Sequence, residues 1–231
     1  MIDRWLCVYM NEYKITGLKA QKNKNRINVY INNEFGFGLE RDVAGWLDVG
    51  QILSIEKIEV LKAKDRIETA YRKAVNFISY KQRTKNEVVR KLEAGGFDSD
   101  IISSVVTRLQ SAGLVDDVRF AEMWINSRSN SKPRGRRLLS IELKKKGISE
   151  EIIDNLLESA EDELLLAKKA ALKKFNQFSK LEYSEFKKKM FSHLSYRGFS
   201  YNTISQVVQE LWSDFQINKK NNTKNEEINY V

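Results

Sequence analysis

Side chains that usually carry out catalysis or bind metals are scarce in this chain of 231 residues. His193 is its one histidine and Cys7 its one cysteine, which excludes an internal disulfide framework and a zinc site built from several cysteines. No serine or cysteine forms a recognisable nucleophile motif with the histidine, and the chain has no P-loop. We therefore predict a binding protein rather than an enzyme, with no catalytic residue, no metal site and no cofactor.

Two short patterns resemble chemical motifs but are better explained as structure. Asp116 and Asp117 could help to hold a metal ion, yet they directly precede an amphipathic pattern, where acidic residues cap a helix. Gly36 and Gly38 could begin a dinucleotide-binding fingerprint, but Arg41 stands where the third glycine is required. We interpret the acidic pair as a helix cap and the glycines as a bulge or a close backbone contact in a strand.

The lone cysteine and histidine also have simple structural explanations. Cys7 is interpreted as a small hydrophobic side chain rather than a reactive thiol. In the internal repeat described below, His193 aligns with Lys91 and Glu142, which predicts a solvated position.

The charges are more informative than these isolated residues. The net charge of +9 favours a polyanion or an acidic protein surface as the partner. Between Ser131 and Gly147 the one acidic residue is Glu142, and the segment 149–163 that follows is strongly acidic. The seven cationic residues between Ser131 and Gly147 are Lys132, Arg134, Arg136, Arg137, Lys144, Lys145 and Lys146.

The elements that position these charges form an internal repeat. Gly96, Gly147 and Gly198 lie 51 residues apart. The same offset aligns a leucine before each glycine and a helix-capping residue after it. These residues are Leu92, Leu143 and Leu194, and then Asp98, Ser149 and Ser200. Apolar residues recur with helical spacing after each cap, so each copy is predicted to be a helix, a glycine hinge and a second helix.

One such unit is too small to bury its own apolar face, whereas stacked copies share a continuous core. A less regular helix precedes each hinged pair, which gives three helices in each repeat. The segment Thr84-Lys-Asn-Glu87 is predicted to be a capping box at the start of the second helix of repeat one. A polar, flexible loop is expected over 126–132 in repeat two, before the chain's one proline, Pro133.

The N-terminal part differs from the repeats. Strands are predicted over 15–20, 26–31 and 34–39 as an antiparallel meander, followed by a short helix over 41–47, a turn at 48–50 and a long helix from Ser54 to about Tyr80. We expect a mainly α protein in which three tandem three-helix, helix–turn–helix-like repeats form an elongated, curved array after a small antiparallel β module. The expected boundaries are 1–54 for the β module, 55–112, 113–163 and 164–215 for the repeats, and 216–231 for a disordered tail.

Helix–turn–helix-like pairs in a basic protein are typical of duplex DNA binding through the second helix of each pair. The charges argue against this arrangement, because 149–163 is acidic and 200–211 contains no lysine or arginine. The cations lie instead on the preceding helices, where Lys85, Arg136 and Lys187 share one repeat position. An ordinary solvated face remains the alternative for any one of them.

The segments that carry this pattern resemble the RecX family, regulators of the RecA-type recombinase. The resemblance covers about residues 70–214 and is clearest in 113–122, GLVDDVRFAE, and in 135–148, GRRLLSIELKKKGI, with support from 83–92 and Gly96-Phe97. The β module resembles the one found in longer members of the family. Repeat three matches the family pattern more loosely than repeat two.

The resemblance implies a cytoplasmic, monomeric modulator, usually an inhibitor, that lies in the groove of the recombinase filament on single-stranded DNA and acts in homologous recombination, DNA repair and the SOS response. Contacts to double-stranded DNA are a further possibility, and no membrane association is expected. A stand-alone DNA-binding regulator and a pure scaffold remain the alternatives. The residues expected to contact recombinase or DNA are Arg83, Lys85, Arg134, Arg136, Arg137, Lys144, Lys145, Lys146, Lys187 and Lys188.

Overall fold

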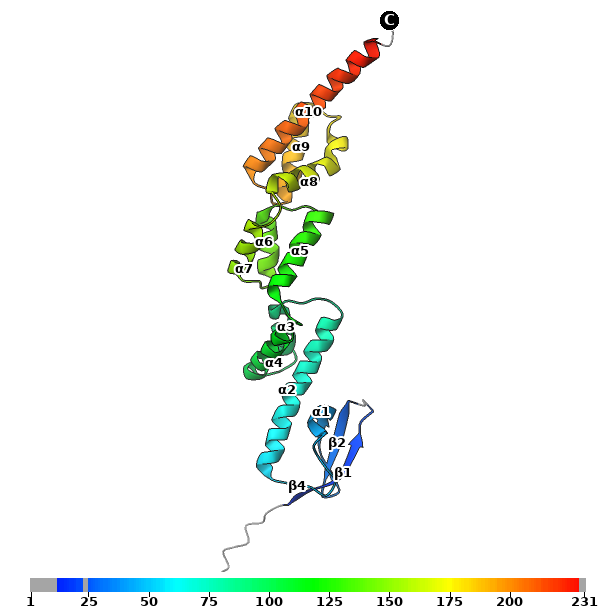
Figure 1. The fold of residues 1–231 in the computed structure, drawn as a ribbon, viewed down its shortest axis with the longest axis vertical. Coiled ribbons are helices and arrows are strands. Elements are labelled where there is room, and N and C mark those ends of the chain that lie inside the picture. Colours follow the sequence, from blue (N-terminus) through cyan, green and yellow to red (C-terminus); the bar gives the residue numbers. More distant parts are fainter. Residues whose placement is uncertain (1–11, 23–24, 229–231) are drawn as a thin grey trace, which may run out of the picture. The chain divides into compact units, whose positions relative to one another are not determined.

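A computed structural model describes residues 12–22 and 25–228, and Cys7 lies outside this range. The chain forms two compact units. The first comprises Met1–Gln82 and Val88–Leu114, and the second Arg83–Glu87 and Val115–Val231. Figure 1 shows a small sheet followed by successive groups of helices. Within the described residues, no helix is long and apolar enough to cross a membrane.

The N-terminal sheet contains the predicted meander. Strands β1 (Tyr13–Ala20), β2 (Arg26–Ile31) and β3 (Glu34–Glu40) pair antiparallel, and a short strand β4 (Ile52–Leu53) pairs with β1, so the order is β3-β2-β1-β4. The β2–β3 hairpin turns at Asn32 and Asn33, both with positive φ, a conformation that asparagine tolerates well. The sequence did not predict β4, because a strand of two residues is too short to show an alternation of apolar and polar side chains.

One face of the sheet is covered by helices α1 (Arg41–Ala44) and α2 (Ile55–Ser79). The sheet contributes Ile15, Val29 and Leu39 to a core that includes Leu61 of α2. Helix α1 ends earlier than the predicted 41–47, whereas α2 matches the predicted long helix and begins at the N-cap Ser54. A side-chain network of Arg26, Glu40 and Asp65 ties the hairpin to α2. The sheet and α2 therefore belong to one unit.

Repeat one consists of the second half of α2, α3 (Lys85–Glu93) and α4 (Ser99–Ser111). The predicted capping box is present: the Glu87 amide donates to Thr84 Oγ1 at 3.2 Å, and the Thr84 amide donates to Glu87 Oε2 at 3.3 Å. The two side chains thereby satisfy the backbone amides of Thr84 and Glu87 at the start of α3.

Repeat two consists of α5 (Asp117–Ser131), α6 (Arg136–Lys145) and α7 (Glu150–Glu158). Asp116 caps α5 by accepting from the Arg119 amide at 3.0 Å. The predicted flexible loop over 126–132 is wrong, because α5 continues to Ser131 and leaves only a short connection around Pro133. Burial of Ile125 and Ser129 on the inner face of α5 outweighs the low helix propensity of the polar sequence.

Repeat three consists of α8 (Glu163–Phe178), α9 (Tyr183–Tyr196) and α10 (Tyr201–Ile228). The expectation of a disordered tail from residue 216 differs from the structure, in which α10 continues to Ile228. No glycine or proline occurs after Gly198 to end that helix. Helix α9 begins at Tyr183, so Lys187 lies one turn inside it rather than at its start, where Lys85 and Arg136 begin α3 and α6.

The three hinges share one geometry. Gly96, Gly147 and Gly198 have φ values of 75°, 81° and 83°, the left-handed conformation predicted for a helix C-cap. The amide after each glycine donates to the carbonyl of the repeat's leucine, at 3.3, 3.2 and 3.3 Å. Leu92 and its two equivalents, Leu143 and Leu194, are fully buried. The repeat predicted from sequence is confirmed as a structural repeat.

Candidate functional site

Successive repeats meet in the second unit where the start of one helix lies against the next glycine hinge. The Gly135 amide, at the N-cap of α6, donates to the Arg197 carbonyl at 2.9 Å. A Cβ atom at Gly135 would lie 2.2 Å from the Gly198 carbonyl oxygen, so only glycine allows this approach. Leu138, one turn into α6, lies against Gly198 in the same way.

The same junction occurs one repeat earlier, also within the second unit. Thr84, equivalent to Gly135, donates from its hydroxyl to the Lys146 carbonyl at 2.7 Å, and Lys146 is equivalent to Arg197. Asn86 lies against Gly147 so closely that a Cβ on the glycine would stand 2.2 Å from the amide nitrogen of Asn86. The donor is a side-chain hydroxyl at Thr84 and a backbone amide at Gly135, but the acceptor is the equivalent backbone carbonyl in both repeats.

In repeat three, the position equivalent to Gly135 is Phe186. Its ring is fully buried and lies 4.9 Å from Trp212 and 5.9 Å from Phe175, measured between ring centroids. This position therefore serves the core of repeat three rather than contact with a further hinge. A terminal repeat with such a modified face is typical of repeat proteins.

The cations predicted to contact recombinase or DNA fall into two groups, with Arg83 considered separately. The first group has carboxylate partners inside the protein. Arg134 pairs with Glu142, Lys146 with Glu87 at 2.6 Å, and Lys144 with Glu150 at 2.5 Å.

Glu142 organises the contacts around Arg134. Its carboxylate also accepts from Trp124 Nε1 at 2.8 Å and Arg128 Nε at 3.1 Å, and Arg128 lies over the Trp124 ring. Burial of the Arg134 side chain, followed by repulsion from Arg128 and Arg197, lowers the pKa of Arg134. These contacts give Arg134 a structural role in repeat two, and the ion pair with Glu87 gives Lys146 one at the junction with repeat one.

The second group is exposed. Among the described residues, none of its members forms an ion pair. They are Lys85, Arg136, Arg137, Lys145, Lys187 and Lys188. Arg83 is half-buried and already engaged in contacts. The exposed cations lie on the second helix of each repeat, α3, α6 and α9, as the charge pattern predicted.

The third helix of repeat two carries the opposite charge. Glu150, Glu151, Asp154 and Glu158 are all exposed on α7. These carboxylates would repel a phosphate backbone, so α7 is unsuited to the major groove. The exposed basic surface of α6 is the better candidate for contact with a polyanion.

His193 is not in the solvated position that the repeat alignment predicted. The side chain is half-buried, its ring lies edge-on to Phe178, and the Ala170 backbone hydrogen-bonds to it. Burial, assisted by Arg197 and Lys174, lowers the pKa of His193 against the opposing effect of the Ala170 bond. Glu142, at the equivalent position, is also drawn inward by its partners on α5.

A cavity of about 550 Å³ opens at the junction of repeats two and three. Its lining residues are Lys132, Arg134, Leu138, His193, Tyr196 and Arg197. Sequence reasoning missed the part played by Tyr196 and Arg197, although the 51-residue offset pairs Arg197 with Lys146 and Tyr196 with Lys145.

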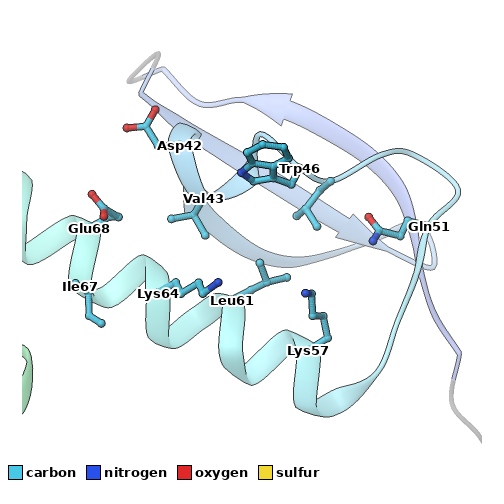
Figure 2. A pocket seen from close by; sticks show the side chains of 10 residues that line it. Asp42, Val43, Trp46, Gln51, Lys57, Leu61, Lys64, Ile67 and Glu68 are labelled. Atoms are coloured by element: carbon cyan, nitrogen blue, oxygen red, sulfur yellow. The ribbon is translucent and has the colours of Figure 1, made fainter.

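The first unit has its own concavity, of about 530 Å³, between α1 and α2 (Figure 2). Trp46 stands exposed at its edge, with Lys57 and Lys64 on α2. Asp42 and Glu68 line the same surface and balance these two lysines. This balance makes the surface a weaker candidate for a polyanion than the junction in the second unit. No group of three potential metal ligands occurs in the described part of the chain.

Comparison with known proteins identifies the family to which the chain belongs. Models of the RecX protein match four segments: the N-terminal domain over residues 13–53, and the first, second and third three-helix domains over 70–109, 116–157 and 161–208. Regulatory protein RecX of Clostridium acetobutylicum is 34% identical over 214 residues, which are 89% of this chain and 99% of that protein. The same-named protein of Bacillus licheniformis is 29% identical over 201 residues, covering 85% and 76% of the two chains.

Solved structures agree with this relationship. A crystal structure of regulatory protein RecX superposes with a TM-score of 0.69 at 27% identity, over 84% of this chain and 98% of that one. RecX from Lactobacillus salivarius superposes with a TM-score of 0.59 at 31% identity, over 64% and 97%. The resemblance stated from the sequence is confirmed, and the chain belongs to the RecX family of regulatory proteins.

Proposed function

We propose that this protein binds the RecA-type recombinase filament on single-stranded DNA and lowers its ATPase and strand-exchange activities. Family membership supports a regulatory role directed at the recombinase. The observation that carries the proposed binding surface is the exposed set of cations on the second helices, which form no ion pairs among the described residues. A filament presents phosphates and carboxylates at intervals, and cations spaced along successive repeats suit such a partner.

The structure identifies which cations to change. Arg136, Arg137 and Lys145 are exposed on α6, whereas Lys144, Lys146 and Arg134 hold internal carboxylates. Changing the first three to alanine removes positive charge from the surface and leaves the core leucines Leu139 and Leu143 in place. The variant is therefore expected to fold.

The test measures recombinase ATP hydrolysis on single-stranded DNA over a range of concentrations of this protein. We expect the wild type to lower the rate and the triple variant to require a much higher concentration for the same effect. A matched control replaces Glu150, Glu151 and Asp154 on the neighbouring α7 with glutamine and should retain the effect. Wild-type potency in a folded triple variant would show that α6 is an ordinary solvated face.

A stand-alone DNA-binding regulator is the alternative. It would bind duplex DNA tightly without recombinase, through the last helix of each pair. Exposed carboxylates on α7 oppose that mode. Gel-shift assays with duplex DNA alone distinguish the two functions.

A further inference from the structure

The two repeat junctions of the second unit differ in one respect that points to a ligand. At the earlier junction the chain supplies its own anion: the Glu87 carboxylate accepts from Lys146 Nζ at 2.6 Å. Burial alone would raise the pKa of Glu87, but bonds from Lys146 and the Thr84 amide, with the charges of Lys146 and Arg83, lower it overall. This junction therefore stabilises a negative charge at that position.

At the later junction the cation is kept and the anion is absent. Arg197 is equivalent to Lys146, and its guanidinium donates to the Pro133 carbonyl at 3.2 Å but forms no ion pair among the described residues. Leu138 at the later junction is equivalent to Glu87 at the earlier one, and His193 is equivalent to Glu142. Two carboxylates have been replaced by an alkyl group and an imidazole.

The space left by this exchange is the cavity of about 550 Å³. Lys132, Arg134 and Arg197 line it. Glu142, the ion-pair partner of Arg134, also accepts from Trp124 and Arg128, whereas Lys132 and Arg197 form no ion pair among the described residues. Three cations therefore share one cavity with a single, already occupied carboxylate. The mutual repulsion of the three cations is relieved when an anion enters the cavity. The cavity therefore favours an oxyanion that can accept hydrogen bonds from several cations at once.

An aromatic side chain at the rim of the cavity indicates which kind of anion could bind there. Tyr196 lines the cavity, and 88% of its surface is exposed. Exposed aromatic rings next to a basic groove are the usual platform on which the bases of a single-stranded nucleic acid stack. A carboxylate from a partner protein would use the cations but would leave the ring without a role.

We propose that this cavity binds one nucleotide of a single-stranded nucleic acid, with a phosphate against Arg197, Arg134 and Lys132 and the base stacked on Tyr196. The proposal rests on the proposed function and adds to it the position at which the strand is held. The site lies at the junction of repeats two and three, and the junction formed by Thr84 and Lys146 is closed to the same ligand by Glu87.

The sharpest variant restores the missing carboxylate. Leu138→Glu copies the equivalent Glu87 and keeps the Cβ atom that lies against Gly198, so the packing of the junction is retained. The new carboxylate is expected to pair with Arg197 and to occupy the anion position from within. Leu138→Gln has the same shape without the charge and serves as the matched control. Tyr196→Ala tests the stacking platform separately.

The chain contains its own reporter, because His193 is its one histidine and lines the cavity. Its imidazole signals in proton NMR spectra are therefore assigned without mutagenesis. The cavity around His193 is also lined by Arg197, Arg134 and Lys132. The positive charges of Arg197 and of Lys174 on α8 lower the pKa of His193. A phosphate that enters the cavity counteracts these charges and should raise that pKa. Titrations use a short oligo-dT and, separately, inorganic phosphate and free dTMP, all without recombinase.

We expect oligo-dT to shift the His193 signals and raise their apparent pKa in the wild type and in Leu138→Gln. Leu138→Glu should bind oligo-dT about tenfold more weakly, as expected on loss of one charge-assisted contact. Tyr196→Ala should weaken oligo-dT binding but leave the response to inorganic phosphate unchanged. A response to dTMP that equals the response to oligo-dT would mean a free nucleotide site and would contradict the proposal.

Two further results would overturn it. One is oligo-dT binding that leaves the His193 signals of the wild type unmoved. The other is a Leu138→Glu variant that binds oligo-dT normally but loses affinity for the recombinase filament, which would identify the anion as a carboxylate of the partner protein. Because no recombinase is present in the titrations, failure of the proposed regulatory function leaves their outcome unaffected.

Discussion

Single glycines determine how successive repeats pack. Gly135 has φ −70° and ψ 159°, values that any residue adopts, so its backbone conformation does not require glycine. Glycine is required by the approach of the Gly198 backbone. Gly147 and Gly198 have two requirements, a left-handed conformation and a close neighbour, whereas Gly96 has only the first.

The Gly135→Ala variant is expected to lose about 1–3 kcal/mol of unfolding free energy through overpacking, because its Cβ would overlap the Gly198 backbone. Gly45→Ala is the matched control, since Gly45 has φ −61° and an added Cβ would meet no atom closer than 3.6 Å. The control should be neutral or slightly stabilising. Urea unfolding measures both. Equal effects of the two substitutions would contradict the proposed close approach.

The three hinge glycines should differ in their tolerance of alanine. Gly96→Ala is expected to cost about 1 kcal/mol from backbone strain alone, because the space around it is open. Gly147→Ala and Gly198→Ala should cost more, since their Cβ atoms would also lie 2.4 Å from the Cβ atoms of Asn86 and Leu138. Thermal unfolding of the three variants gives the ranking. Equal losses in the three variants would show that the backbone strain they share, and not packing, dominates.

His193 makes stability depend on pH. Its pKa is lowered in the folded protein, first by burial and then by Arg197 and Lys174, whereas the unfolded chain has the ordinary value of about 6.5. Between these two values the unfolded chain binds more protons, so stability falls as pH falls through this window. We expect His193→Gln to lose this component. Urea midpoints measured from pH 7 to pH 5 should therefore decline less in the variant than in the wild type.

At the scale of elements, α5 depends on a contact outside itself. The polar second half of α5 is helical, and within it Arg128 pairs with Glu142 and lies over the Trp124 ring. We expect these contacts to stabilise the helix there. Glu142→Ala leaves Arg128, Arg134 and the Trp124 ring nitrogen without their shared acceptor. We expect faster amide hydrogen exchange over 126–131 and unchanged exchange in α8. Uniform protection of α5 in the variant would show that this half is helical on its own.

At the scale of the whole molecule, the separation of exposed from internally paired cations should appear in the salt dependence of binding. Each phosphate contact that is lost lowers the log–log slope by about 0.7 for a single strand. Replacing Arg136, Arg137 and Lys145 by alanine should therefore flatten the slope for filament binding. Replacing Lys144, which is paired with Glu150, should change it little. Fluorescence anisotropy over a range of salt concentrations tests this, and equal slopes for all variants would contradict the assignment.

The sequence by itself determined the repeat, its hinges and most of its helix starts. Left-handed glycines, the Thr84–Glu87 capping box and the buried leucines follow from interactions within a few residues, and the chain's periodicity displays them directly. The resemblance to the RecX family rested on the same segments. The exposure of the cations on α3, α6 and α9 could also be predicted, because the helical spacing of the apolar residues places the cations on a different face from the core.

Only the tertiary structure decided which cations are available and why Gly135 is a glycine. The partners of Arg134 and Lys146 lie on other helices, and the neighbour of Gly135 belongs to the next repeat. The segment 126–131 likewise contacts a different helix, through the ion pair of Arg128 with Glu142. Local propensity and periodicity carry no information about contacts between residues distant in sequence, because these form only when the repeats pack against one another.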